Sequence, residues 1–271
     1  GVLYSDSPAS RAKAQGVLFY GCSVKSTFWR NFNRYRHLLT PWAKYEGYSD
    51  PLVAADHVYI FSIADGFHRL DLVKVGLKNT LISLKPQKFL PTFEIDLYSQ
   101  AFLRKEVRLI SFPKGYVDFR WSLPSFSVLN QNCWNIEYKV LDYSKLRLGW
   151  TASSALAIAF EYRYRSQYAW RKAMEDNFIL DAAREVSALL DSSVSDRRNT
   201  ILTHAYWKIN SYLSLEAQSR HGFKRQGEPA YNACQIDLFF LLSSAWKIKL
   251  SYQYTKSDPY RITFDYYLLK L

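Results

Sequence analysis

The dominant pattern along the chain is an alternation of apolar and polar residues, which recurs in nine segments. In the segment 93–103 the apolar residues Phe93, Ile95 and Leu97 share one parity, whereas Glu94 and Asp96 take the other. The same alternation recurs in the segments 117–123, 134–140, 146–150, 156–164, 205–209, 213–217, 246–254 and 260–268. A period of two is typical of a β-strand with one apolar face. The sequence therefore predicts an all-β protein.

The length of the alternating segments indicates the class of β protein. Strands of globular proteins average about five or six residues, but transmembrane strands need about 9–11 because they cross the bilayer at a tilt. Several segments reach this length, and Trp and Tyr lie near the ends of their apolar faces, as in interfacial aromatic girdles. We expect an antiparallel transmembrane β-barrel, or a large part of one, with roughly 12–14 strands. The alternative is a soluble, ligand-binding β domain whose apolar faces point inward.

One segment departs from the alternation. From Tyr168 to Leu190 apolar residues, among them Trp170, Met174 and Phe178, recur every three or four positions. This spacing predicts an amphipathic helix over 168–190. We expect residues 1–271 to form a single β-barrel domain in which this helix is an insertion in a long connection. Most prolines fall between the alternating segments, and Pro41 alone is expected inside a strand.

The sequence contains no recognisable catalytic motif. P-loop, GxGxxG, GxSxG and HExxH patterns are absent, and none of the five histidines belongs to such a pattern. Cys22, Cys133 and Cys234 lie more than a hundred residues apart without CxxC spacing, which argues against a metal site. We expect small buried thiols, with a disulfide as the alternative. The prediction is a protein that is not an enzyme and has no cofactor.

The formal net charge of +12 suggests an anionic partner. The polar strand faces carry more cations than anions, and they define a candidate lumen-facing substrate path: Lys74, Lys78, Arg120, Lys139, Arg147, Arg163, Arg165, Lys208, Lys247 and Lys249. A cationic lumen favours an anionic glycolipid as cargo, and a mixed interior that neutralises itself is the alternative. Nucleic acid is disfavoured, because a stacking surface needs aromatic and basic residues on one face and here they take opposite parities.

Two neighbouring segments carry a family resemblance. The segment Arg34-Tyr-Arg-His-Leu-Leu-Thr-Pro-Trp-Ala-Lys-Tyr-Glu-Gly-Tyr48, followed by Asp65-Gly-Phe-His-Arg-Leu and Val75-Gly-Leu-Lys-Asn79, resembles the LptD-type lipopolysaccharide-assembly barrels of Gram-negative outer membranes. Those barrels have about twice as many strands and follow a periplasmic β-jellyroll domain. The chain is therefore expected to be the C-terminal part of a longer chain, or a divergent relative.

The resemblance implies a function and a location. It implies that the protein lies in the outer membrane and transports lipopolysaccharide to the cell surface, with a plug lipoprotein and a periplasmic bridge protein as partners. No lateral-gate residue is carried over from the family. A general porin or passive channel has the same architecture and remains an alternative, and a membrane lipase is a more distant one.

Overall fold

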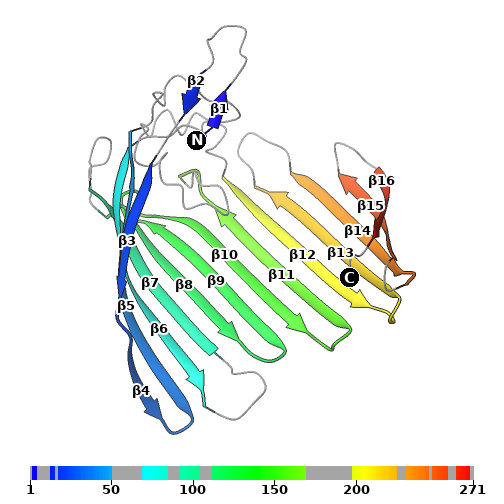
Figure 1. Ribbon diagram of the computed structural model, residues 1–271, viewed down its shortest axis with the longest axis horizontal. Coiled ribbons are helices and arrows are strands. Elements are labelled where there is room, and N and C mark those ends of the chain that lie inside the picture. Colours follow the sequence, from blue (N-terminus) through cyan, green and yellow to red (C-terminus); the bar gives the residue numbers. More distant parts are fainter. Residues whose placement is uncertain are drawn as a thin grey trace.

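The computed structural model describes residues 2–4, 13–15, 18–50, 69–84, 92–103, 112–168, 197–224, 230–243, 246–255 and 261–268. These residues form strands joined by turns and connections (Figure 1). The strands are β1 (Val2–Tyr4), β2 (Lys13–Gln15), β3 (Phe19–Lys25), β4 (Phe28–Phe32), β5 (Tyr35–Tyr48), β6 (Leu70–Ser83), β7 (Thr92–Phe102), β8 (Lys114–Ser122), β9 (Phe126–Asn135), β10 (Val140–Thr151), β11 (Leu156–Arg165), β12 (Arg198–Lys208), β13 (Leu213–Phe223), β14 (Tyr231–Leu241), β15 (Trp246–Thr255) and β16 (Arg261–Leu268).

A single antiparallel sheet dominates the fold. Thirteen strands follow one another in chain order from β3 and β5 to β16, and β4 joins the same sheet alongside β5. The strand number agrees with the prediction, as does the all-β antiparallel class. The sheet is open, because β3 and β16 are its two edges in the described part of the chain. The closed barrel of the sequence prediction is therefore not formed by the described strands themselves.

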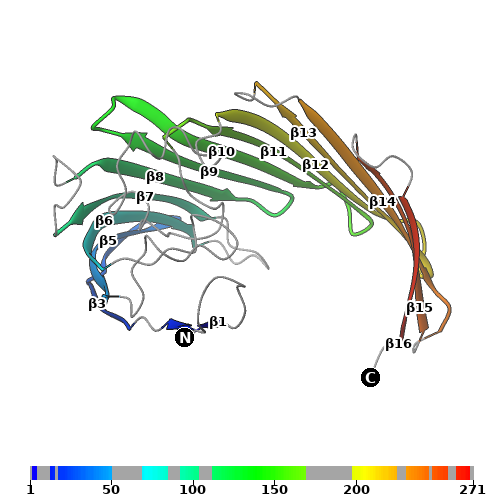
Figure 2. The same cartoon turned by 90° about the horizontal axis from the view of Figure 1, so that it is seen from above.

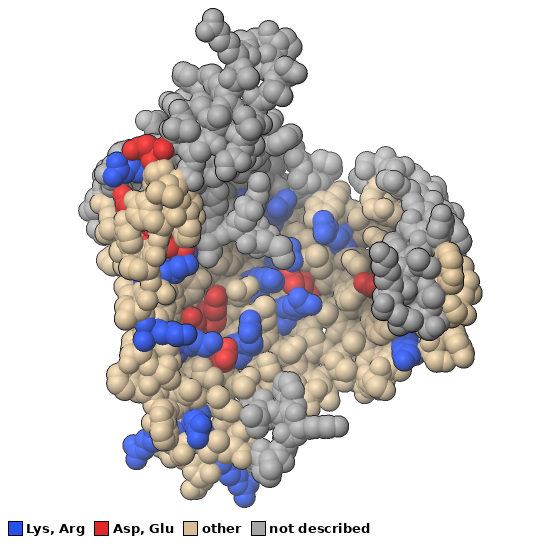
Figure 3. All heavy atoms as spheres, in the orientation of Figure 1, with Lys and Arg blue, Asp and Glu red and all other residues tan. Residues whose placement is uncertain are grey.

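The sheet has two chemically different faces. Registers connect residues of one parity across neighbouring strands, for example Lys74 to Gln100, Gln100 to Lys114 and Lys114 to Asn135. Seen from above, the sheet is bent into an arch (Figure 2). The space-filling view into this arch shows Lys, Arg, Asp and Glu gathered on its inner wall (Figure 3). The charged parity is therefore the concave face, and the apolar parity is the convex face.

The convex face is mainly apolar, with Asn130, Asn132 and Ser144 among its polar side chains, and many of its described apolar side chains are exposed. Its side chains include Leu97 (47% exposed), Ile236 (42%) and Leu250 (40%). Across β7 to β15, the described strands place no Asp, Glu, Lys or Arg on the convex parity. The one residue outside either parity there is Asp142 in a bulge of β10, and it turns to the concave side as described below. None of the described residues forms a helix long and apolar enough to cross a bilayer.

The strand predicted over 134–140 is wrong. β9 ends at Asn135, residues 136–139 form a turn, and β10 begins at Val140. Asn135 Oδ1 accepts a hydrogen bond from Tyr138 N at 3.1 Å, and Lys139 has a positive φ of 54°. Alternation continues through this turn because its side chains are also alternately apolar and polar, so the pattern concealed the reversal. Lys139 therefore lies in a turn and not on a strand face.

Pro41 lies inside a strand, as predicted. It pairs with Leu77 of β6 on one side, and on the other side it lies opposite the gap between β3 and β4. Ser26 N donates to Pro41 O at 3.2 Å, but proline has no N–H with which to return the bond. Since β3 and β4 pair with β5 in the same register, the missing donor of Pro41 accounts for the interruption between them.

Two other sequence predictions concern the insertion and the thiols. Apart from Tyr168, which lies in a turn, the amphipathic helix predicted over 168–190 falls outside the described residues.

All three cysteines are free thiols. Cys133 is buried as expected, whereas Cys22 is exposed and Cys234 is partly buried. The prediction of buried thiols is thus confirmed for Cys133 and wrong for Cys22.

Candidate functional site

The concave face brings the predicted substrate-path residues together. All of them except Lys139 have the concave parity: Lys74 and Lys78 on β6, Arg120 on β8, Arg147 on β10, Arg163 and Arg165 on β11, Lys208 on β12, and Lys247 and Lys249 on β15. Strand pairing places them there because the side-chain period of two is kept from one strand to the next. Lys139 is excluded by the turn that contains it.

Cations outnumber anions on this face. The described strands β3 to β15 place sixteen Lys and Arg on the concave parity against eight Asp and Glu. The cations are Lys25, Arg36, Lys44, Lys74, Lys78, Lys114, Arg120, Lys145, Arg147, Arg163, Arg165, Arg198, Lys208, Arg220, Lys247 and Lys249; the anions are Glu46, Glu94, Asp96, Asp118, Asp142, Glu161, Glu216 and Asp237. Half of the positive charge therefore has no counterpart in the wall itself.

Glu161 illustrates the imbalance. Its carboxylate lies 3.9 Å from Lys145 Nζ and 4.0 Å from Arg147 Nε, and it also pairs with Arg163 Nε. Glu161 is largely buried, whereas the Arg147 side chain is more than half exposed. One carboxylate shared by three cations leaves a net positive group at the surface of the concave face.

Several other concave cations have one acidic partner among the described residues, or none. Lys78 Nζ lies 3.1 Å from Glu94 Oε2, and Lys249 Nζ lies 3.2 Å from Asp237 Oδ2. Arg120, Lys208 and Arg220 form no ion pair with any described residue. Unpaired cations on an exposed polar wall attract anions from solution.

A hollow of about 320 Å³ lies on the concave face over β10 to β15. Two small side chains, Ala159 and Ala233, stand in its wall between longer polar ones. The polar residues of concave parity that line it are Arg147, Glu161, His204, Gln218, Arg220, Gln235 and Gln253, and Thr203 and Ser219 line it as well. His204 Nε2 lies 2.8 Å from Glu216 Oε1, which fixes the imidazole ring at the edge of this group.

A buried ion pair escaped the sequence analysis. Lys114 Nζ lies 2.7 Å from Asp142 Oδ2, and both side chains are almost fully buried. Asp142 also accepts a hydrogen bond from Ser166 Oγ at 3.1 Å. The β10 register shifts between Leu141 and Tyr143, and this bulge turns Asp142 toward the concave side. An acidic residue on the apolar parity of the sequence was the only signal that could have revealed the bulge.

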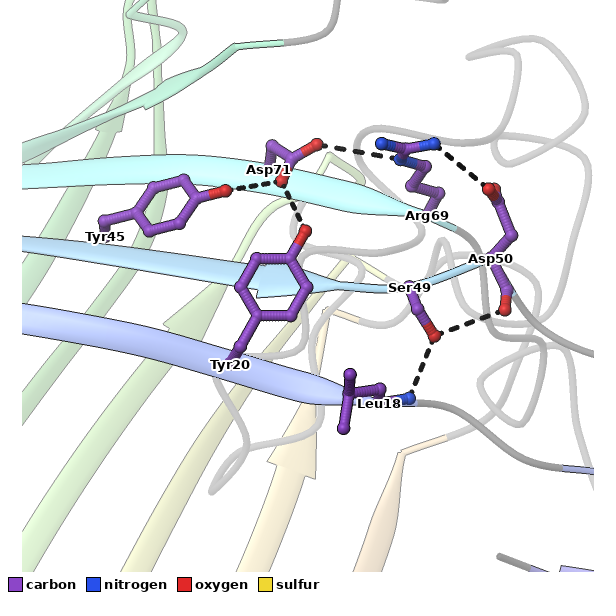
Figure 4. Close-up of polar contacts among 7 residues, drawn as sticks. All are labelled: Leu18, Tyr20, Tyr45, Ser49, Asp50, Arg69 and Asp71. Carbon is purple, nitrogen blue, oxygen red and sulfur yellow. Dashed lines mark hydrogen bonds and ion pairs between the residues drawn. The ribbon is translucent and has the colours of Figure 1, made fainter.

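A polar cluster lies on the convex parity near one edge of the sheet (Figure 4). The hydroxyls of Tyr20 and Tyr45 donate to Asp71 Oδ1 at 3.0 and 2.8 Å. Arg69 lies 3.8 Å from Asp71 Oδ2 and donates to Asp50 Oδ2 at 3.1 Å. This cluster lies at the ends of β3, β5 and β6, so it does not interrupt the charge-free convex surface of β7 to β15.

Comparison with known proteins adds no relative: the chain matches no protein-family model and no curated protein. Within the structure, the segment 34–48 contains β5, which pairs along its whole length with β6. The described residues hold no group of three or more His, Cys, Asp or Glu side chains that could bind a metal ion.

Proposed function

We propose that the chain forms the wall of an outer-membrane β-barrel that carries an anionic glycolipid, lipopolysaccharide in particular, to the cell surface. The observation that carries the proposal is the convex face of β7 to β15, which is exposed, mainly apolar and without Asp, Glu, Lys or Arg in the described strands. An uncovered apolar face of this extent would cause aggregation in water. In a lipid bilayer such a face is required, because a transmembrane barrel contacts lipid with apolar side chains and keeps its polar side chains in the lumen.

Aromatic residues at both ends of the strands support a bilayer position. Trp121, Trp150, Trp207 and Trp246 lie on the convex parity within one residue of the strand end that carries the connections 123–125, 152–155 and 209–212. Trp134, Tyr164 and Tyr254 lie next to the opposite ends of their strands. Ten residues of a strand span about 25 Å along the membrane normal at a tilt of about 40°, which matches the apolar band of such barrels.

The lengths of the connections suggest an orientation. Those at the first end, 33–34, 84–91, 123–125, 152–155, 209–212 and 242–245, have two to eight residues, whereas the longest two, 49–69 and 166–197, both lie at the other end. Outer-membrane barrels have short periplasmic turns and longer external loops. In the proposed orientation the end with the short connections therefore faces the periplasm.

The nature of the cargo follows from the excess of concave cations and from the family resemblance. A wall with twice as many cations as anions favours a phosphorylated amphiphile over a neutral solute. The resemblance of 34–48 and 65–79 to LptD-type barrels supports lipopolysaccharide, a plug lipoprotein and a periplasmic bridge protein as partners. In this proposal the edges β3 and β16 of the described sheet must be paired in the membrane, since lipid does not tolerate unpaired strand edges.

Folding in lipid tests the membrane role. The purified chain should require detergent or vesicles to stay monodisperse, and its unboiled form should migrate differently from its boiled form in electrophoresis. A monodisperse monomer in detergent-free buffer would refute the membrane role and favour the soluble ligand-binding alternative.

Conductance and crosslinking separate a transporter from a porin. Photo-crosslinkers at the concave positions Arg163 and Lys249 should label lipopolysaccharide in cells, whereas a crosslinker at convex Leu97 should label phospholipid as well. Steady open conductance in planar bilayers, without lipopolysaccharide adducts at the concave positions, would favour the passive channel.

A further inference from the structure

The hollow over β10 to β15 is built from two adjacent rows of the concave face. One row runs across neighbouring strands as Gly149, Ala159, His204, Gln218, Gln235 and Gln253. The second row lies two residues from the first on each strand, toward the same end of the sheet. It consists of Arg147, Glu161, Leu202, Arg220, Ala233 and Thr255. Amides thus line one side of the hollow, and two guanidinium groups stand in the other.

The amide row presents hydrogen-bond acceptors. Gln235 Nε2 donates to both carboxylate oxygens of Asp237 at 3.0 and 2.9 Å, and Gln218 Nε2 donates to Glu216 Oε1 at 3.1 Å. Because a carboxylate can only accept, these contacts determine which end of each amide is nitrogen. The Oε1 atoms of Gln218 and Gln235 are left to accept from a ligand, and Gln253 has no described partner for either end. Neutral amides of this kind suit hydroxyl groups.

The guanidinium groups present a site for an anion. Arg220 is exposed and has no described acidic partner, and Arg147 shares Glu161 with Lys145 and Arg163. Three strand spacings separate the backbones of Arg147 and Arg220, about 14 Å. Two long side chains can converge over Leu202 across this distance. Arginine binds phosphate and carboxylate through paired N–H donors.

The hollow also has a suitable shape. Ala159 and Ala233 replace the long side chains found elsewhere on the concave face and leave about 320 Å³ free. That volume lies at the small end of the range for ligand pockets, about 300–1,000 Å³. It suits one sugar ring with a charged substituent and is too small for a large apolar group.

We infer that this hollow is a binding subsite for a phosphate-bearing saccharide, with the phosphate on Arg220 and Arg147 and the sugar hydroxyls on the glutamine row. The inference rests on the proposed function, because it identifies the part of the cargo that the concave wall recognises. It goes beyond the proposed function because it assigns the recognition of the sugar phosphate to the six strands β10 to β15. The cations of β6 and β8 lie outside the subsite.

Calorimetric titration of the full chain folded in detergent micelles tests the inference. The probes are glucose 1-phosphate, glucose and inorganic phosphate. Glucose 1-phosphate should bind roughly tenfold more tightly than either of the other two. Arg220→Gln should weaken this binding about tenfold, the effect of losing a charge-assisted hydrogen bond, and Gln253→Ala should weaken it several-fold.

Matched variants outside the hollow serve as controls. Arg120→Gln removes another exposed, unpaired concave arginine, and Gln131→Ala removes another concave glutamine, both from strands that do not line the hollow. Each should leave binding within about twofold of the unmodified chain. Equal losses in Arg120→Gln and Arg220→Gln would reduce the effect to general electrostatics and overturn the subsite. So would equal affinity for inorganic phosphate, or no binding of glucose 1-phosphate at all.

Two further measurements identify the source of the sugar phosphate and separate the two proposals. Lipopolysaccharide micelles should displace glucose 1-phosphate if a glycolipid headgroup occupies the hollow; binding without displacement assigns the subsite to free sugar phosphates. Insertion into vesicles is measured on the same preparations. A chain that inserts but does not bind refutes the subsite alone, whereas a chain that fails to insert refutes the membrane role.

Discussion

Ile236 offers a sharp test of which solvent the convex face meets. It lies at the centre of β14, with five residues of the strand on either side, and its side chain is exposed on the convex face. At about 3.4 Å per residue, each strand end is about 17 Å away, or about 13 Å along the membrane normal at a tilt of about 40°. An apolar band about 25 Å tall therefore places Ile236 near the bilayer midplane.

Replacing Ile236 by arginine should have very different costs in water and in lipid. A cation on the lipid face at the midplane costs about 2–4 kcal/mol in a barrel, whereas a substitution at an exposed position of a soluble sheet changes stability by about 0.5 kcal/mol or less. The free energy of unfolding should be measured by guanidinium titration of the chain folded into phosphatidylcholine vesicles, with tryptophan fluorescence as the signal.

The neighbouring residue supplies the control. Gln235 has the concave parity and lies beside Asp237, so Gln235→Arg should change the free energy of unfolding by less than about 1 kcal/mol. A loss of about 2–4 kcal/mol in Ile236→Arg with little change in Gln235→Arg is the expected result. Equal, small effects at both positions would show that the convex face is wetted, and the reasoning on which the membrane role depends would fail.

Two predictions concern the interior of the sheet. Lys114→Met leaves Asp142 as a buried charge without its 2.7 Å partner, so it should lower the free energy of unfolding by about 3–5 kcal/mol. The double variant Lys114→Met/Asp142→Leu should regain most of that loss. A Lys114→Met variant as stable as the unmodified chain in the same guanidinium titration would contradict this account. Pro41→Ala supplies the backbone N–H that is missing opposite Ser26, and this new amide should exchange slowly in hydrogen-exchange NMR or mass spectrometry. The free energy of unfolding should change by less than about 1 kcal/mol, because the unfolded chain also gains conformational freedom. Free exchange of the new amide would mean that Pro41 does not cause the break between β3 and β4.

Alternation along the chain was a sound guide wherever a strand was long and its neighbours regular. It predicted the all-β class and the sorting of charged residues to one parity, because a strand repeats every two residues whatever its partners are. It failed at 134–140, where a turn with its own alternating residues joins β9 and β10. It also could not show the bulge at Asp142, since a shift of register is a property of two strands and not of one.

The sequence by itself determined that the chain forms long strands and that apolar and charged residues lie on opposite faces, because both follow from local periodicity. Only the tertiary structure decided which face is concave, that Lys114 meets Asp142, and that Arg147 and Arg220 border one hollow. These relations depend on register and curvature accumulated across several strands, as between β10 and β13. Small rotations between neighbouring strands add up over the sheet, so the sequence of one strand does not reveal the curvature of the whole sheet.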